Sequence, residues 1–145
     1  MTITVSESPR LLMPGMADFE PGIERYRVTG GAVTAVLLGA GDRLQVIDPE
    51  GCQPVEVAAF DRDGHSDPGL LGDLPHGASG APATGIAAIL ASDQHDARRV
   101  ADALSGKGID LAAATAVHLF APDSPAGLEA WLTATTDLVC VIGVT

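Results

Sequence analysis

Residues 32–60, AVTAVLLGAGDRLQVIDPEGCQPVEVAAF, decide the fold because they hold three short apolar runs separated by turn-forming residues. The runs cover 32–38, 43–48 and 54–60, and each of them is bounded by Gly, Pro or Asp. Runs of this length and spacing are typical of consecutive β-strands. The sequence therefore predicts an antiparallel sheet that is built mainly from the first half of the chain.

The second run shows how its side chains are divided between two faces. Leu44 and Val46 alternate with Arg43, Gln45 and Ile47. A strand places successive side chains on opposite faces, so one face is apolar and the other is mixed. The segments between the runs are rich in residues that tolerate tight turns. We therefore expect the three strands to pair in sequence order as an antiparallel meander.

The segments that flank these strands differ from them in composition. Residues 1–24 contain repeated prolines and no sustained period, which predicts an extended leader. Residues 61–83 contain five glycines and three prolines, which predicts a long mobile loop.

The second half of the chain predicts two short helices. Residues 92–106 open with capping side chains, carry apolar residues at helical spacing and end at a glycine. Ser124 followed by Pro125 is typical of a helix start. The apolar residues after this start also have helical spacing: Leu128, Trp131 and Leu132.

Two further strands are predicted in the second half of 111–120 and over 138–144. The fold class is therefore α+β, an antiparallel sheet with two short helices in a single domain over 25–145. Because the run 138–144 is apolar and ends the chain, we expect an open sheet edge there and a further segment or partner beyond Thr145.

Composition and charge exclude several classes of partner. The 145 residues include 8 Lys plus Arg against 19 Asp plus Glu, a net charge of −11, which repels nucleic acid and anionic membranes. No apolar run approaches the roughly 20 residues that span a bilayer, and no secretory signal is recognisable. The isolated cysteines Cys52 and Cys140 suggest reduced thiols. We expect a cytoplasmic protein.

The histidines form no metal-binding motif. His65, His76, His95 and His118 have no HxH, HxxxH or HExxH spacing, so we predict no metal ligand within this segment. No phosphate-binding loop with a lysine is present either, so no cofactor-binding residue is assigned.

Carboxylates in turns are the remaining catalytic candidates. Asp48, Glu50 and Cys52 share one turn, and Asp61 and Asp63 share another. Turn chemistry alone explains carboxylates at such positions, and acidic neighbours do not favour a reactive Cys52 thiolate. We predict that Asp48, Glu50 and Cys52 are the candidates if the segment is catalytic, and that a turn role is the better explanation.

The stretch 39–60, GAGDRLQVIDPEGCQPVEVAAF, resembles the urea-carboxylase-associated family. The shared pattern is a basic residue, a strand, Asp-x-x-Gly-x-Gln and a second strand that ends near Phe. The matching positions here are Asp48, Gly51, Gln53 and Phe60.

A wider resemblance covers PGMADFEPGIERYRVTGG at 14–31, the turn at 48–53, LFAPDSPAG at 119–127 and DLVC at 137–140. These stretches are similar to the N-terminal region of the trimethylamine-N-oxide demethylase family, whose long chains end in an aminomethyltransferase domain. The resemblance implies zinc, iron and tetrahydrofolate in the rest of such a chain. Two isolated cysteines do not make a three-cysteine zinc site, so none of those ligands is assigned here.

Three hypotheses follow from the sequence. In the first, the chain is a structural or assembly domain of a folate-linked demethylase that contacts the remaining domains and forms a homo-oligomer through the apolar edge at 138–144. In the second, it is a stand-alone metal-dependent enzyme that resembles urea-carboxylase-associated deiminases. In the third, it is an adaptor that only dimerises.

Overall fold

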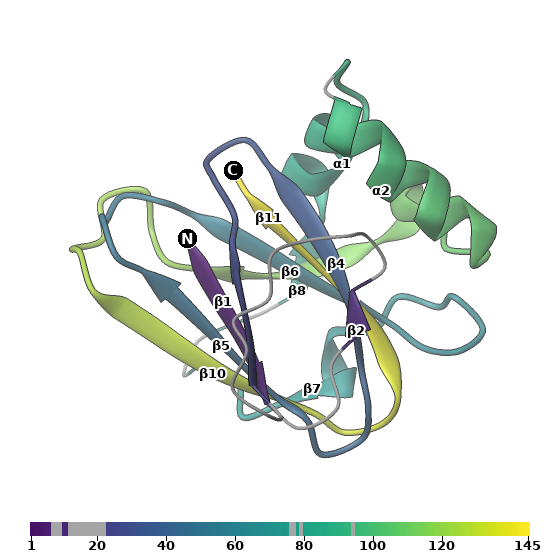
Figure 1. Cartoon of the computed structure of the whole chain (residues 1–145), viewed down its shortest axis with the longest axis horizontal. Coiled ribbons are helices and arrows are strands. Elements are labelled where there is room, and N and C mark those ends of the chain that lie inside the picture. Colours follow the sequence, from purple (N-terminus) through teal and green to yellow (C-terminus); the bar gives the residue numbers. More distant parts are fainter. Residues whose placement is uncertain (7–9, 12–22, 76–77, 79, 94) are drawn as a thin grey trace.

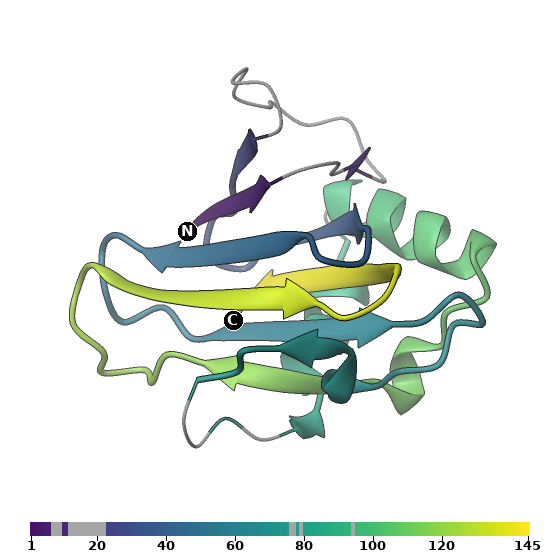
Figure 2. The same ribbon diagram turned by 90° about the horizontal axis from the view of Figure 1, so that it is seen from below.

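The computed structural model describes residues 1–6, 10–11, 23–75, 78, 80–93 and 95–145. These residues form two antiparallel sheets that pack against each other, and two helices lie on one of the sheets (Figures 1 and 2). The predicted α+β class is confirmed, but the strands are divided between two sheets.

The five-stranded sheet has the order β3-β1-β5-β10-β7. Its strands, in that order, are Ile23–Arg27, Thr2–Ser6, Arg43–Asp48, Leu128–Ala134 and Leu71–Gly72. The six-stranded sheet has the order β2-β4-β11-β6-β9-β8. Its strands, in that order, are Arg10–Leu11, Val33–Leu38, Leu138–Val144, Val55–Phe60, Thr115–Leu119 and Gly80–Pro82.

The predicted strands β4, β5 and β6 are all present, but the predicted meander is wrong. β4 and β6 lie in the six-stranded sheet, whereas β5 lies in the five-stranded one. The two connecting turns therefore carry the chain from one sheet to the other. In the first turn the Asp42 carboxylate accepts a hydrogen bond from the Gly39 N–H, with an N–O distance of 2.8 Å. An alternating pattern reports which face of a strand is buried and not which strand lies beside it.

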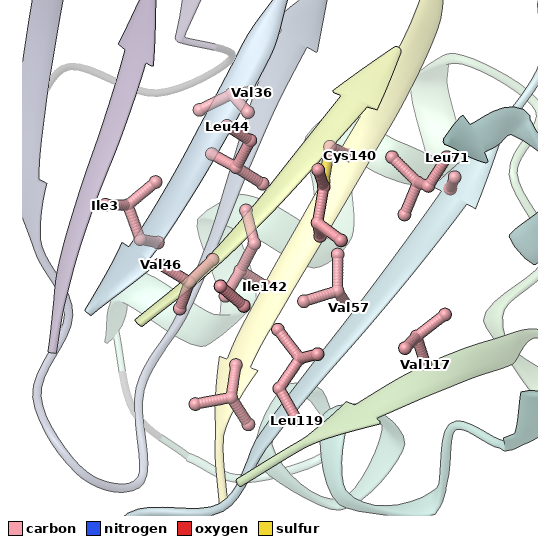
Figure 3. Close-up of a cluster of buried hydrophobic side chains, with 14 of the residues drawn as sticks. Ile3, Val36, Leu44, Val46, Val57, Leu71, Val117, Leu119, Cys140 and Ile142 are labelled. Carbon is pink, nitrogen blue, oxygen red and sulfur yellow. The ribbon is translucent and has the colours of Figure 1, made fainter. Parts of the chain in front are cut away.

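Two hydrophobic cores lie on opposite faces of the six-stranded sheet. The first fills the space between the sheets, where side chains such as Ile3, Leu44, Val57 and Ile142 meet (Figure 3). The second lies between the six-stranded sheet and the helices, and it contains Val141. The six-stranded sheet is therefore buried on both faces.

Strand β11 lies in the middle of the six-stranded sheet. It pairs with β4 on one side and with β6 on the other, and all seven of its residues are buried. The prediction of an open apolar edge at 138–144 is wrong, because both edges of this strand are already paired. Continuous apolar sequence indicates burial on two faces, which is also what a central strand shows.

The helices are α1, Thr84–Leu90, and α2, His95–Gly106. Helix α2 confirms the prediction over 92–106. Helix α1 was not predicted, and its capping group comes from another element. The carboxylate of Glu56 on β6 accepts hydrogen bonds from the N–H groups of Gly85 at 3.1 Å and Ile86 at 2.8 Å. Side chains that accept from exposed N–H groups stabilise a helix start.

The helix predicted after Ser124 is wrong, because residues 128–134 form strand β10. Ala130, Leu132 and Ala134 alternate into the core between the sheets, and the intervening Trp131 is directed away from it. The same apolar residues fit a helical spacing and a strand spacing, and packing against the facing sheet selects the strand.

The predicted leader and loop both contain structure. Strand β1 lies between β3 and β5, so Thr2–Ser6 is an integral part of a sheet. Residues 61–83 include the 3-10 turn Pro68–Leu70 and the short strands β7 and β8. The parts of the predicted leader at 7–9 and 12–22 lie outside the described residues.

Strand β9 confirms the strand predicted in the second half of 111–120, and a second 3-10 turn, Leu111–Ala113, precedes it. No helix in the described part of the chain is long and apolar enough to span a membrane.

Candidate functional site

The turn from Asp48 to Gln53 follows β5 and holds the three candidate catalytic residues. Asp48 is fully buried, and both of its carboxylate oxygens accept backbone hydrogen bonds. Oδ1 accepts from the N–H groups of Gly51 at 2.8 Å and Glu50 at 3.2 Å, and Oδ2 accepts from that of Gln53 at 3.2 Å. An aspartate that accepts from the residues after it fixes the path of a turn. Asp48 therefore has a structural role in this turn.

A second loop, residues 124–127, supports the turn from the side. The N–H of Cys52 donates to the Ser124 carbonyl at 2.9 Å, and the N–H of Gly127 donates to the Asp48 carbonyl at 2.7 Å. Gly51 has φ +83°, and a Cβ there would lie 2.8 Å from the backbone nitrogen of Ala126. Only glycine fits both this backbone conformation and this contact. The glycine of the Asp-x-x-Gly-x-Gln pattern is thus explained by packing.

The other two candidates are directed outward. Glu50 and Cys52 are exposed, and the Cys52 Sγ lies 3.6 Å from the Ser124 carbonyl oxygen. Cys52 also has a positive φ of 58°, an uncommon conformation for a residue with a side chain. The structure brings Asp48, Glu50 and Cys52 into one turn, but it separates the buried carboxylate from the two exposed side chains.

Two buried polar atoms in this pair of loops have no hydrogen-bond partner among the described residues. They are Gln53 Oε1 and Ser124 Oγ. Buried polar atoms of this kind are where proteins commonly hold an ordered water molecule. The glutamine of the pattern therefore belongs to the interior of the loop pair and not to an open surface.

The second predicted carboxylate pair lies in the turn after β6. Asp61 Oδ1 accepts hydrogen bonds from the N–H groups of Asp63 and His65, both at 2.9 Å. The hydrogen bond from the His65 N–H is the main reason why the pKa of Asp61 is lowered. The side chains of Asp61, Asp63 and His65 have ligand atoms within 4.8 Å of one another. The half-buried Asp61 and the exposed Asp63 and His65 form a compact acidic turn, and its own backbone hydrogen bonds explain the arrangement. His76, which the sequence placed in the same loop region, lies outside the described residues.

A cavity of about 560 Å³ lies beside this turn. Apolar side chains from β4, β11 and the segment after α2 line it, and so do four charged side chains: Asp61, Arg62, Lys107 and Asp137. Arg62 Nη2 and Asp137 Oδ2 form an ion pair at 2.6 Å. The Asp137 carboxylate also accepts from the Ala40 N–H at 2.9 Å, and this hydrogen bond, followed by Arg62, lowers the pKa of Asp137.

Sequence reasoning missed this cavity because four distant segments form it. Lys107 is the one lysine of the chain, and that is the single feature that could have drawn attention to it. His118 has a half-exposed side chain whose Nδ1 lies 3.9 Å from Glu56 Oε1. That distance is too long for a hydrogen bond.

The two cysteines cannot bind one metal ion together, because one thiol is exposed and the other is buried in the core. Cys140 lies on β11 in the core between the sheets (Figure 3). Cys52 is exposed in the turn after β5. Burial raises the pKa of the Cys140 thiol to about 12, so this side chain stays a protonated, apolar core group. The structure thus offers no cysteine pair for the zinc that the resemblance implies.

Comparison with known proteins gives one informative match. The chain is 36% identical over 132 residues to trimethylamine-oxide aldolase of Ruegeria pomeroyi. The match covers 91% of this chain and 16% of the aldolase. No protein-family model matches the chain, and the resemblance to the urea-carboxylase-associated family stays a prediction. The chain is therefore similar, over nearly its whole length, to a small segment of a much longer trimethylamine-oxide aldolase.

Proposed function

We propose that this chain is a structural and assembly domain of a folate-linked demethylase similar to trimethylamine-oxide aldolase. The observation that carries the proposal is the match itself, which uses 91% of this chain but only 16% of the aldolase. In this proposal, most of the groups that such an enzyme needs are supplied by the remaining domains of a longer protein.

The reaction implied by the resemblance needs no external oxidant. Trimethylamine N-oxide is split into dimethylamine and formaldehyde, whose atoms together equal those of the substrate, and the formaldehyde is passed to tetrahydrofolate. The protein must therefore polarise the N-oxide and contain the formaldehyde, and it does not have to supply electrons. Zinc and iron are the groups that the resemblance associates with this chemistry.

The geometry of the described residues supports a role other than catalysis. Asp48 is engaged in three backbone hydrogen bonds, and Cys140 is a core residue. Cys52 alone cannot replace a zinc site that needs several thiolates. We therefore assign no metal-dependent step of the reaction to this chain, and we propose that the chain serves in folding and assembly.

The test is an assay of two purified samples. The first is the natural gene product, whose intact mass and metal content are measured, and the second is the 145-residue chain alone. We expect the natural product to be several times longer than 145 residues and to release dimethylamine and formaldehyde in equal amounts from trimethylamine N-oxide. We expect the 145-residue chain to bind no stoichiometric metal and to release neither product.

The opposite pattern would favour the second hypothesis. If the natural product ends near Thr145 and holds stoichiometric zinc or iron, the chain is a stand-alone enzyme. The exposed pair Glu50 and Cys52 would then be the first residues to substitute.

A further inference from the structure

The outer face of the five-stranded sheet carries several arginine side chains, Arg25, Arg27 and Arg43. Both helices pack on the six-stranded sheet, as Figures 1 and 2 show. The five-stranded sheet buries Ile3, Val46 and Ala130 on its inner side, so the residues that alternate with them are directed outward. We call this outward surface the open face.

The strand register arranges the open face in rows. One row runs from Arg27 on β3 across Thr2 and Ile47 to Glu129 on β10. The next row runs from Arg25 across Thr4 and Gln45 to Trp131. Each row therefore starts with an arginine and ends, three strands away, in a group that attracts a guanidinium: a carboxylate in one row and an indole ring in the other.

Basic side chains gather on the open face. Among the described residues it carries Arg25, Arg27 and Arg43 together with two carboxylates, Glu129 and, at the β10 edge, Asp73, which accepts a hydrogen bond from Thr133 at 2.6 Å. The other surfaces of two such chains, each with a net charge of −11, repel one another. The open face, with three arginines and two carboxylates among the described residues, does not share this strong negative charge.

Several side chains of the open face are already held in place. The Arg43 guanidinium lies 4.3 Å from the centre of the Trp131 ring. The Gln45 side-chain amide donates to Glu129 Oε2 at 3.0 Å. Ordered side chains lose less conformational entropy on binding, and Trp and Arg are the residues most often found at the centre of interfaces.

We propose that a second copy of this chain docks on the open face, so that two open faces pack against each other about a twofold axis parallel to the strands. This axis passes between β1 and β5 and places β3 of one copy over β10 of the other. Arg27 then lies opposite Glu129 of the second copy, and Arg25 lies opposite the Trp131 end of the second copy. The symmetry forms each contact twice.

The proposal names a surface for the assembly role proposed above, and its test does not depend on that role because it measures association alone. The dissociation constant of the 145-residue chain is measured by sedimentation equilibrium for the wild type and for Arg27→Glu, Glu129→Arg and the double variant. Each single substitution places two pairs of like charges at the interface, so we expect dimerisation to weaken at least tenfold. The double variant restores opposite charges, and we expect its dissociation constant to return to within about threefold of the wild-type value.

Arg98→Glu is the matched control, because Arg98 is exposed on helix α2, away from the open face. We expect it to leave the dissociation constant unchanged, and circular dichroism will verify that all variants are folded. A wild-type chain that is monomeric at about 100 µM, single variants that dimerise as well as the wild type, or a double variant that stays as weak as the single variants would each overturn the proposal. Failure of trimethylamine N-oxide cleavage, in contrast, would leave the dimer intact and overturn only the proposed activity.

Discussion

Strands β11 and β5 lie in facing sheets, and their sequences differ as their surroundings do. β11, LVCVIGV, is buried at all seven positions because one face meets the other sheet and the other face meets the helices. β5, RLQVID, has buried residues at alternate positions because its inner face packs against the other sheet, and its remaining residues are exposed or half-buried. The number of covered faces determines which positions of a strand must be apolar. Among the described residues, the comparison also separates a sheet that is packed on both faces from one that is packed on its inner face.

The largest effect on the free energy of unfolding should come from replacing a buried isoleucine of β11 by alanine, and the same replacement on β5 is the comparison. Ile142 on β11 is fully buried, and Ile47 on β5 lies on the open face and is half-buried. We expect Ile142→Ala to lower the free energy of unfolding by about 2–5 kcal/mol, since it leaves a cavity between the sheets. We expect Ile47→Ala to cost less than about 1 kcal/mol. Urea unfolding at a concentration where the chain is monomeric measures both values, and equal losses would contradict the assignment of the faces.

The second prediction compares the reactivity of the two thiols. Cys140 is buried on β11 and its pKa is raised to about 12, whereas Cys52 is exposed. Because the thiolate is the reactive form, we expect Cys140 to react at least about a hundredfold more slowly than Cys52 with a thiol reagent at pH 8. Mass spectrometry after timed labelling counts the modified cysteines, and denaturant should make both react. Rapid labelling of both thiols in the folded chain would mean that β11 is not enclosed.

The third prediction concerns the helices that cover the six-stranded sheet. Glu56→Ala removes the carboxylate that accepts from the Gly85 and Ile86 N–H groups. We expect a loss of about 1–3 kcal/mol in the free energy of unfolding, because buried donors would be left without partners. Hydrogen exchange should show the loss of protection first in α1. Glu129→Ala on the open face is the matched control, and a comparable loss there would argue against a specific capping role for Glu56.

The smallest effect on stability should come from Asp137, in the turn that joins β10 to β11, and it should depend on pH. The Ala40 N–H and Arg62 lower the pKa of Asp137 below 3.8, so its ionised form stabilises the fold. This contribution is present above pH 3.8 and is lost as the pH falls through the lowered pKa. We expect Asp137→Asn to be slightly less stable than the wild type at pH 7 and to lose less stability than the wild type on acidification to pH 2.

Thermal unfolding between pH 7 and pH 2 follows both proteins, with Asp123→Asn, an exposed change in the loop that precedes β10, as the control. Parallel curves for the wild type and Asp137→Asn would show that the ion pair with Arg62 and the hydrogen bond from Ala40 do not contribute.

Local sequence patterns predicted β4, β5, β6, β11 and helix α2 because a strand or a helix face repeats within a few residues. They did not predict that β5 crosses to the other sheet, since tight turns serve hairpins and crossings alike. Helix α1 was missed because its cap is the side chain of Glu56, nearly thirty residues earlier. Residues 128–134 were assigned to a helix because their apolar spacing fits both periods, and only the facing sheet decides between them.

At the candidate site, too, the sequence predicted local features but not the contacts between distant segments. The sequence placed Asp48, Glu50 and Cys52 in one turn, and the structure confirms that they share it. The hydrogen bonds to the Asp48 carboxylate all come from within the turn, as its residues lead one to expect. The support that the turn receives from the loop at 124–127 is not revealed by any local pattern. The cavity near Asp137 was missed for a similar reason, because its charged groups come from three separate segments.

The central claim, that this segment supports an aldolase-like enzyme without supplying its catalytic groups, can be tested in the purified natural protein. The variant Glu50→Gln/Cys52→Ser removes both exposed candidate groups at positions where substitution should leave the fold intact. Formaldehyde release from trimethylamine N-oxide is measured for this variant and for the wild type at equal metal content. We predict turnover within about twofold of wild type. A loss of a hundredfold or more in a folded, metal-replete variant would contradict the account and identify the Asp48–Gln53 turn as part of an active site.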